Sequence, residues 1–237
     1  MCLNDTIRKF VIFKNMNLNY QKKRDLMVEN QLRPNKIKNP IILSLFKTIP
    51  KEDFFTEEAS SIPYSDLDIN IKDNRGYLKN LHTAQIINYS EIDQKHKVLH
   101  IGALTGYVTV LLSNLCSEVI AIEEDSDLRL MLKKNIDKKG IKNIKIVDAS
   151  LKTGFNDESP YDRIIIDNPI KKINNTIYDQ LSDQMGKIIM IEKIRDQLNQ
   201  AYRITKNDGN LSKEYLFDVF SKYALYEDKE EFKFWWI

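Results

Sequence analysis

The sequence predicts an α/β fold, Rossmann-like, with a mostly parallel sheet covered on both faces and an antiparallel hairpin at its end. Short apolar runs with strand length and composition alternate with helical segments from about residue 97 onward. Near the end of the chain, Asn207-Asp208-Gly209 forms a hairpin turn signal between two further strand candidates. Counting these runs gives an expected sheet of seven strands.

A helical cap is predicted to precede the sheet over about residues 17–90. The first helix should run from Asn17 to Leu32, where apolar positions share one face, and should end before Pro34. Asn39 is a good N-cap for a second helix, with Pro40 in its first turn. A loop is expected over about 56–76 and a short helix over 82–89.

The sheet elements follow in order, each strand ending at a turn or a polar residue. Strands are predicted at 97–101, 118–122, 144–147, 163–166 and 187–194, with two more on either side of residues 207–209, and helices at 108–115 and 126–139. We interpret residues 17–237 as one domain. Residues 1–16 are interpreted as a disordered lead or a wrongly assigned start.

The composition excludes several classes of protein. The 237 residues include 36 Lys and Arg against 34 Asp and Glu, a net charge of +2, which argues against a dedicated nucleic-acid partner. Two cysteines and three scattered histidines are too few for a disulfide framework or a metal site. Without a long apolar run, the chain is expected to be cytoplasmic, with no membrane partner.

A ligand site is predicted where the first strand of the sheet ends. Gly102 and Gly106 bracket a sharp strand-to-helix turn whose backbone N–H groups can face an electron-rich ligand. Glu123 follows the second strand, 21 positions after Gly102, within reach of two ribose hydroxyls. Two alternatives remain open at this point. The glycines can be plain turn residues beside a surface acid, or the fold can bind a nicotinamide cofactor, although the loop lacks the dinucleotide spacing.

Several short motifs stand in one order along the chain, from roughly Asn17 to the C-terminus, and each is weak alone. The motifs are Met27-Val28-Glu29-Asn30-Gln31-Leu32-Arg33, Ile49-Pro50-Lys51-Glu52-Asp53-Phe54, Tyr64-Ser65-Asp66, Val98 to Tyr107, Gly154-Phe155 with Ser159-Pro160-Tyr161-Asp162, and Gln184-Met185-Gly186. Together, in this order, they resemble the protein-L-isoaspartate O-methyltransferase family. The tail, with Phe217-Asp218, Phe232 and Phe234, resembles a shortened, divergent bacterial branch of that family.

The resemblance implies a class I methyltransferase that uses S-adenosylmethionine and methylates isoaspartyl carboxylates of damaged proteins or peptides, which leads to their repair. A carboxylate is already a nucleophile, so catalysis would consist mainly of alignment. The resemblance places the cofactor on a set of loop and strand-end residues. They are Gly102, Ala103, Leu104, Thr105, Gly106, Glu123, Glu124 and Ser150.

Four positions depart from the family pattern. His100 and Ser150 stand where the family has acids, and Leu104 replaces the middle glycine of the loop, with its bulk expected to face the cofactor. Lys79 stands where the family has a serine that contacts the substrate, so no catalytic residue is assigned. These departures predict weak cofactor binding. They leave two alternatives open, namely a non-catalytic binding module with this fold and a methyltransferase for another substrate. The oligomeric state is left open.

Overall fold

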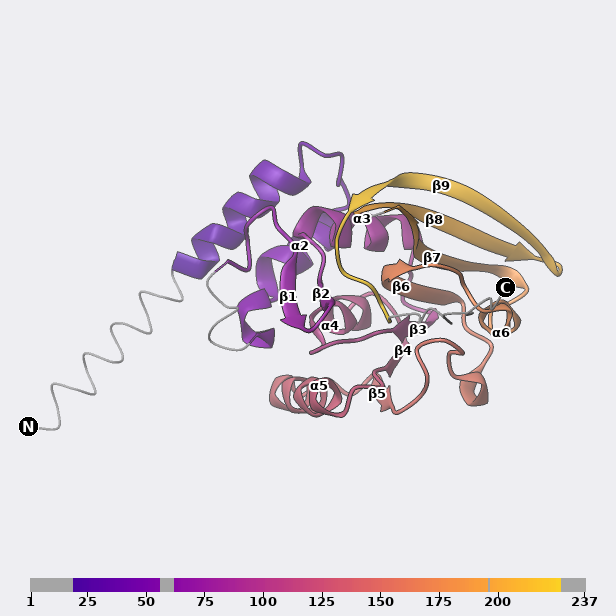
Figure 1. Cartoon of the computed structure of the whole chain (residues 1–237). Helices are drawn as coiled ribbons and strands as arrows, with labels where there is room; N and C mark the ends of the chain where they lie inside the picture. The colour runs from indigo at the N-terminus through magenta and orange to yellow at the C-terminus, as the bar shows by residue number, and fades with distance from the viewer. Residues whose placement is uncertain (1–18, 56–61, 196, 227–237) are drawn as a thin grey trace, which may run out of the picture.

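The computed structural model describes residues 19–55, 62–195 and 197–226, and its N-terminal helices, which we call the cap, lie at one side of the molecule (Figure 1). Residues 19–27 are α-helical and continue into a π-helical turn, η1 (Val28–Leu32), which ends just before Pro34 as expected. The Asn39 side chain accepts the backbone N–H groups of Ile41 and Ile42 at the start of α2 (Pro40–Thr48). A 3₁₀ turn, η2 (Lys51–Phe54), follows, and the lead proposed for residues 1–16 lies outside the described residues.

A seven-stranded sheet forms the centre of the molecule, with spatial order β5-β4-β3-β6-β7-β8-β9. The five strands β5, β4, β3, β6 and β7 are parallel, whereas β8 runs antiparallel to both of its neighbours. The predicted parallel sheet with a terminal antiparallel hairpin is therefore confirmed. Its strands are β3 (Lys97–Ile101), β4 (Glu118–Ile122), β5 (Ile144–Val147), β6 (Arg163–Ile170), β7 (Gln184–Arg195), β8 (Leu198–Asn207) and β9 (Asn210–Phe220).

The two faces of the sheet are covered unequally. One face packs against α3 (Asn80–Ser90), α4 (Tyr107–Ser113), α5 (Ser126–Lys139) and the N-terminal cap, in one continuous apolar cluster. The other face packs against the short α6 (Asn175–Asp179), the loops around it and Leu225. Both faces are thus covered, as predicted, but the second one mostly by irregular chain that includes the 3₁₀ turn η4 (Asn156–Glu158).

Turn residues explain both hairpins of the fold. Asp208 and Gly209 join β8 to β9 with φ angles of +48° and +77°, the backbone form that suits a tight hairpin. The stretch predicted as a loop contains a second hairpin, β1 (Ile69–Lys72) and β2 (Arg75–Tyr77), so the prediction was wrong there. Its strands are too short to show clear alternation, and only the polar Asp73-Asn74 turn marks them in the sequence.

The order of the strands fixes where a ligand can bind. From β3 the chain runs through α4 to β4 on one side, and later returns to β6 on the other side. Ligands of open α/β sheets bind at the carboxyl ends of the strands where the order reverses in this way. The site is therefore expected between the ends of β3, β4 and β6. Among the described helices, none is long and apolar enough to cross a membrane.

A fully buried lysine joins η2 to the start of α3. Lys51 donates hydrogen bonds from Nζ to Leu78 O (3.3 Å) and Asn80 Oδ1 (3.1 Å), and its ammonium lies over the rings of Tyr77 and Tyr107. Burial lowers the pKa of Lys51 to about 7, although nearby carboxylates partly oppose the shift. The folded protein therefore releases this proton near neutrality, whereas the unfolded chain keeps it until about pH 10.4.

We expect Lys51 to make stability depend on pH between about 7 and 10. In this range the unfolded state binds more protons at Lys51, so this residue's contribution to the free energy of unfolding should rise with pH, by at most about 1.4 kcal/mol per pH unit. The substitution Lys51→Met should remove this slope. Urea unfolding of both proteins at pH 7, 8 and 9 measures the difference, and parallel pH dependences would contradict the assignment.

Candidate functional site

The loop after β3 has the backbone expected of a ligand-binding turn. Gly102, Leu104 and Gly106 all have positive φ angles, of +89°, +51° and +102°. The backbone N–H groups of Gly102 and Ala103 both donate to Ile122 O (3.0 Å each), which joins the loop to the end of β4. Positive φ favours glycine because a side chain costs roughly 1–2 kcal/mol there. The departure at Leu104 thus carries backbone strain.

The Leu104 side chain lies elsewhere than expected. It is fully buried and belongs to the apolar cluster shared with the cap, α3 and α4. It is not among the described residues that line the cavity reported below. The expectation that its bulk faces the cofactor is therefore not met.

Thr105 connects the loop to the cap. Its Oγ1 donates to Phe54 O (2.6 Å), and the Tyr77 hydroxyl lies 3.0 Å from the same atom. Tyr77 in turn accepts the backbone N–H of Tyr107 at the start of α4 (3.0 Å). All three side chains are buried, and burial raises the pKa of Tyr77 and of Tyr107 above the usual value, so both stay neutral. Thr105 thus has its hydroxyl fully engaged within the protein.

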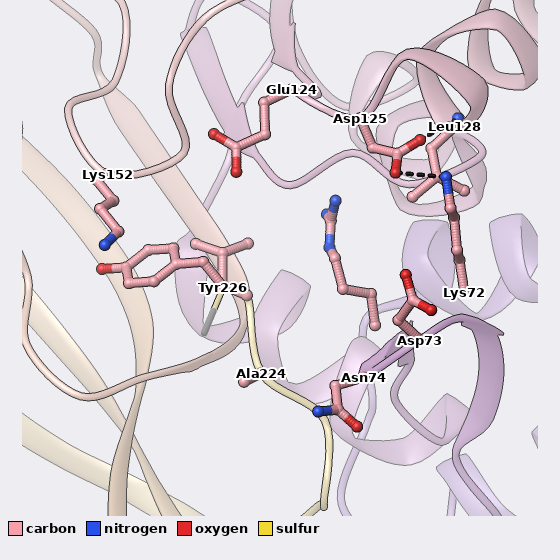
Figure 2. A pocket seen from close by; sticks show the side chains of 11 residues that line it. Lys72, Asp73, Asn74, Glu124, Asp125, Leu128, Lys152, Ala224 and Tyr226 are labelled. Carbon is pink, nitrogen blue, oxygen red and sulfur yellow. Dashed lines mark hydrogen bonds and ion pairs between the residues drawn. The ribbon is translucent and has the colours of Figure 1, made fainter. Parts of the chain in front are cut away.

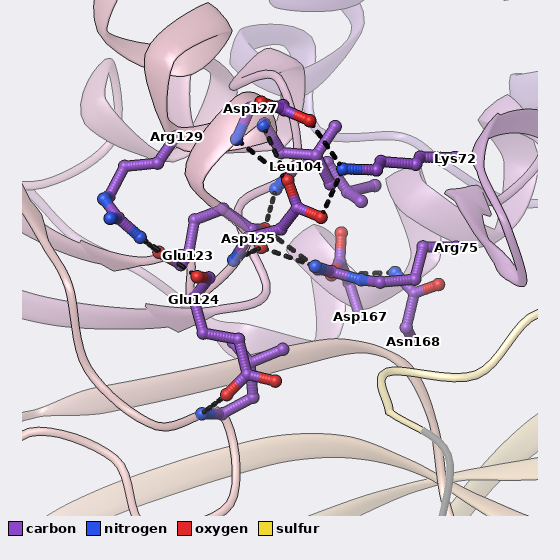
Figure 3. A network of polar contacts seen from close by, with 12 residues as sticks. Lys72, Arg75, Leu104, Glu123, Glu124, Asp125, Asp127, Arg129, Asp167 and Asn168 are labelled. Carbon is purple, nitrogen blue, oxygen red and sulfur yellow. Dashed lines mark hydrogen bonds and ion pairs between the residues drawn. The ribbon is translucent and has the colours of Figure 1, made fainter.

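Glu123 stands at the end of β4, as predicted, but its carboxylate is occupied. Arg75 forms a bidentate ion pair with it, Nη1 to Oε1 at 2.5 Å and Nη2 to Oε2 at 2.9 Å (Figure 3). The backbone N–H groups of Leu104 and Asp125 also donate to Glu123, at 2.8 and 3.1 Å. The Glu123 side chain is 0% exposed. It therefore has no free face for a pair of ribose hydroxyls while Arg75 stays in place.

A cavity of 660 Å³ adjoins this ion pair, between the β1–β2 hairpin and the end of β4. Glu124 and Asp125 lie on one side of it, and Asn74, Ala224 and Tyr226 on the other (Figure 2). Lys72 pairs across its rim with Asp125 (2.7 Å) and Asp127 (2.9 Å). The chain thus has an open cavity with charged residues around it, beside the glycine loop.

Of the remaining predicted residues, one lines the cavity and two do not. Glu124 lines it and accepts the backbone N–H of Leu151 at 3.1 Å. Ser150 is exposed, and its Oγ accepts a hydrogen bond from the backbone N–H of Lys152, so its side chain stabilises the local turn. Lys79 lies at the start of α3, where its ammonium pairs with Asp66 at 3.3 Å. The structure therefore brings Glu124 to the cavity, but not Ser150 or Lys79.

A buried polar group lies on β3 and β6, close to the Arg75 side chain. His100 Nδ1 lies 2.9 Å from Thr109 Oγ1, and His100 Nε2 lies 3.4 Å from Asp167 Oδ1. Asn168 donates a long hydrogen bond (3.4 Å) to the same Asp167 oxygen, and Figure 3 shows both residues beside the Arg75 side chain. Position 100 therefore has no acid of its own, but Asp167 on the neighbouring strand β6 places a carboxylate next to it.

Sequence reasoning missed the residues that close the site. Arg75 lay in a predicted loop, and Asp167 and Asn168 were not among the residues assigned to the site. The Asp73-Asn74 turn is the signal that could have located Arg75, because a hairpin there carries the next residue back toward the sheet. Leu225, whose side chain lies against Gly102, has no local signal in the sequence. Within the described ranges, no group of three or more His, Cys, Asp or Glu side chains is arranged to hold a metal ion.

Comparison with known proteins gives one consistent result. A family model described as protein-L-isoaspartate(D-aspartate) O-methyltransferase matches residues 21–222. The chain is 30% identical over 183 residues to protein-L-isoaspartate O-methyltransferase 1 of Syntrophobacter fumaroxidans, covering 77% of this chain and 84% of the relative. It is 31% identical over 202 residues to the protein-L-isoaspartate O-methyltransferase of Dictyoglomus turgidum, covering 84% and 90%.

A solved structure supports the fold. A protein-L-isoaspartate O-methyltransferase superposes with a TM-score of 0.73 and 23% sequence identity. The superposition covers 85% of this chain and 65% of that one, so this chain spans about two thirds of the length of the solved protein. The class I methyltransferase architecture predicted from the sequence is confirmed.

We predict that Leu104→Gly destabilises the protein, because the lost packing outweighs the released strain. Removing a fully buried leucine side chain costs about 2–5 kcal/mol, whereas glycine recovers roughly 1–2 kcal/mol of backbone strain. The matched variant Leu104→Ala loses most of the packing and keeps the strain. Denaturant unfolding should therefore rank the proteins as wild type, then Leu104→Gly, then Leu104→Ala. A glycine variant less stable than the alanine variant would show that the loop carries no such strain.

Proposed function

This chain belongs to the protein-L-isoaspartate(D-aspartate) O-methyltransferase family, and we propose that it methylates the carboxylate of isoaspartyl residues in protein or peptide substrates, with S-adenosylmethionine as methyl donor. The observation that carries the proposal is the placement of the Gly102–Gly106 loop and Glu123 at adjacent strand ends. These are the groups that the fold uses for an adenosine-containing ligand. We place the protein in the cytoplasm, without a nucleic-acid or membrane partner.

The residues fit this cofactor in kind, but their present arrangement does not admit it. The glycine loop and the acid after β4 stand at the expected strand ends. Glu123, however, is fully bonded to Arg75 and to two backbone N–H groups, and Leu225 covers Gly102. Binding would therefore require Arg75 and Leu225 to move. When bound, S-adenosylmethionine supplies a methyl group on a positively charged sulfur.

The tasks left to the chain are orientation and exclusion of water. A substrate carboxylate is a nucleophile without help from a base, so in-line alignment accounts for most of the required rate enhancement. The loop backbone is held by hydrogen bonds to Ile122 O, and His100 by its contact with Thr109, so the loop and the His100–Asp167 pair can serve as one wall of such a site. Lys79, at the start of α3, is the cation that stands where the family has its serine. Its charge suits an anionic substrate, although here it pairs with Asp66.

One observation favours a second candidate function. The Arg75–Glu123 ion pair satisfies the cofactor-binding acid internally, as expected if the fold serves only as a binding module. A module of this kind would keep the sheet and the surface of a methyltransferase without transferring methyl groups. The two candidates differ in one measurable property, which is isoaspartyl-dependent methyl incorporation.

We expect the protein to transfer radiolabelled methyl groups to an isoaspartyl peptide and not to its aspartyl isomer. The substitution Lys79→Ser should increase the rate, about tenfold if a fixed hydroxyl improves alignment by about 1.4 kcal/mol. Lys138→Ser, at an exposed position in the last turn of α5, is the control and should leave the rate unchanged. Absence of isoaspartyl-specific incorporation in all three proteins would reject the methyltransferase and support the binding module.

A further inference from the structure

The cleft beside the glycine loop is covered by two segments of the chain itself. One is the β1–β2 hairpin, which forms a separate two-stranded sheet and carries Arg75. The other is the segment 221–226, which leaves β9 and crosses the carboxyl ends of the strands (Figure 1). We call the hairpin and this segment together the flap.

The two parts of the flap are joined to each other. Ala224 donates its backbone N–H to Asn74 O at the hairpin turn (3.1 Å). The Tyr223 ring lies so close to Gly76 that a Cβ there would come within 2.7 Å of Tyr223 Cε2. Glycine at position 76 thus permits the contact. Because the hairpin and segment 221–226 share these contacts, they can move as one unit.

The flap occupies the place of a ligand at two points. The Leu225 side chain lies directly on Gly102, where an added Cβ would collide with its Cδ1, and Arg75 Nη2 lies 3.3 Å from the same point. The Leu225 backbone N–H donates to Pro169 O (2.9 Å), which holds the segment against β6. Arg75 meanwhile saturates both oxygens of Glu123. The face of the loop and the acid after β4 are therefore both covered by the protein itself.

The closed arrangement leaves polar atoms unsatisfied in the flap and beneath it. Arg75 Nε, His100 Nε2 and Asn168 Oδ1 are buried and have no hydrogen-bond partner within the described part of the chain. Buried polar groups without partners disfavour the state that contains them. His100 and Asn168 both lie next to Asp167, and Figure 3 shows Asp167 and Asn168 beside the Arg75 side chain. Polar atoms without partners are therefore present in and beside the Arg75–Glu123 pair, where a ligand that displaces Arg75 could bond to them.

From these contacts we infer that Arg75 is an internal competitor for the cofactor, and that the flap must open before an adenosine-containing ligand can bind. This inference rests on the proposed function. The Arg75 guanidinium occupies the position at Glu123 that the ribose hydroxyls of a bound ligand would take. Its positive charge would also repel the positively charged sulfur of S-adenosylmethionine. The closed flap accordingly weakens binding of S-adenosylmethionine more than binding of S-adenosylhomocysteine, which lacks that charge. The chain keeps its affinity low by its own ion pair rather than by loss of the site.

Calorimetric titration of the full chain with both ligands tests this inference. Arg75→Met should raise the affinity for S-adenosylhomocysteine at least tenfold, and the affinity for S-adenosylmethionine by a larger factor. Leu225→Ala, which uncovers Gly102, should raise both affinities severalfold. Arg203→Met is the matched control, because the Arg203 side chain is similarly exposed (19% against 14% for Arg75). Arg203 lies on β8, away from the cleft, and pairs with Glu214 on β9 and with Glu91 at the end of α3. It should change neither affinity.

The opposite results overturn the inference. Equal affinities of the wild type and Arg75→Met would show that Arg75 is no barrier, and a lower affinity of Arg75→Met would make it a ligand-binding residue. Failure of both proteins to bind at millimolar ligand would show that closure does not cause the weakness. Thermal unfolding checks that each variant folds. If Arg75→Met does not fold, Arg75→Lys takes its place; because lysine cannot form the bidentate pair, this variant should show a smaller gain in affinity for both ligands. Tight binding by Arg75→Met without methyl transfer to the peptide would reject the proposed function alone.

Discussion

The bidentate ion pair between Arg75 and Glu123 is the interaction on which the arrangement of the site depends. It joins the β1–β2 hairpin to the end of β4. Glu123 also accepts a hydrogen bond from the Leu104 N–H, which joins the same carboxylate to the glycine loop. A fully buried carboxylate needs such partners, because removal of a charge from water is costly unless it is paired and hydrogen-bonded. Any ligand that binds Glu123 must therefore donate equivalent hydrogen bonds to its carboxylate, and Arg75 must then move out into solvent.

Most of the fold could be predicted from the sequence, because its strands and helices carry strong local signals. The apolar runs from β3 to β7, the Asn39 cap and the Asp208-Gly209 turn each depend on neighbouring residues only. The hairpin β1–β2 was missed because its strands are four and three residues long and gain stability only by packing against the sheet. Such tertiary stabilisation leaves little trace in the sequence.

The candidate site was predictable only in outline. Gly102, Gly106 and Glu123 lie where the spacing placed them, at adjacent strand ends. Their contacts were not predictable, since Arg75 and Leu225 reach the cleft from positions 48 residues before Glu123 and well over 100 residues after Gly102. His100 shows the same limit. The sequence shows that an acid is absent there, but only the parallel register of β3 and β6 reveals that Asp167 supplies one from the next strand.

The energetic coupling between Arg75 and Glu123 tests this account most directly. A double-mutant cycle with Arg75→Met, Glu123→Gln and the double variant, followed by urea unfolding, isolates their interaction from the loss of each side chain alone. The account predicts that the two substitutions are strongly non-additive, with a coupling free energy of about 2 kcal/mol or more, because the pair is bidentate and Glu123 is fully buried. Additive effects, within about 0.5 kcal/mol, would mean that the pair does not hold the cleft closed and would contradict the central claim.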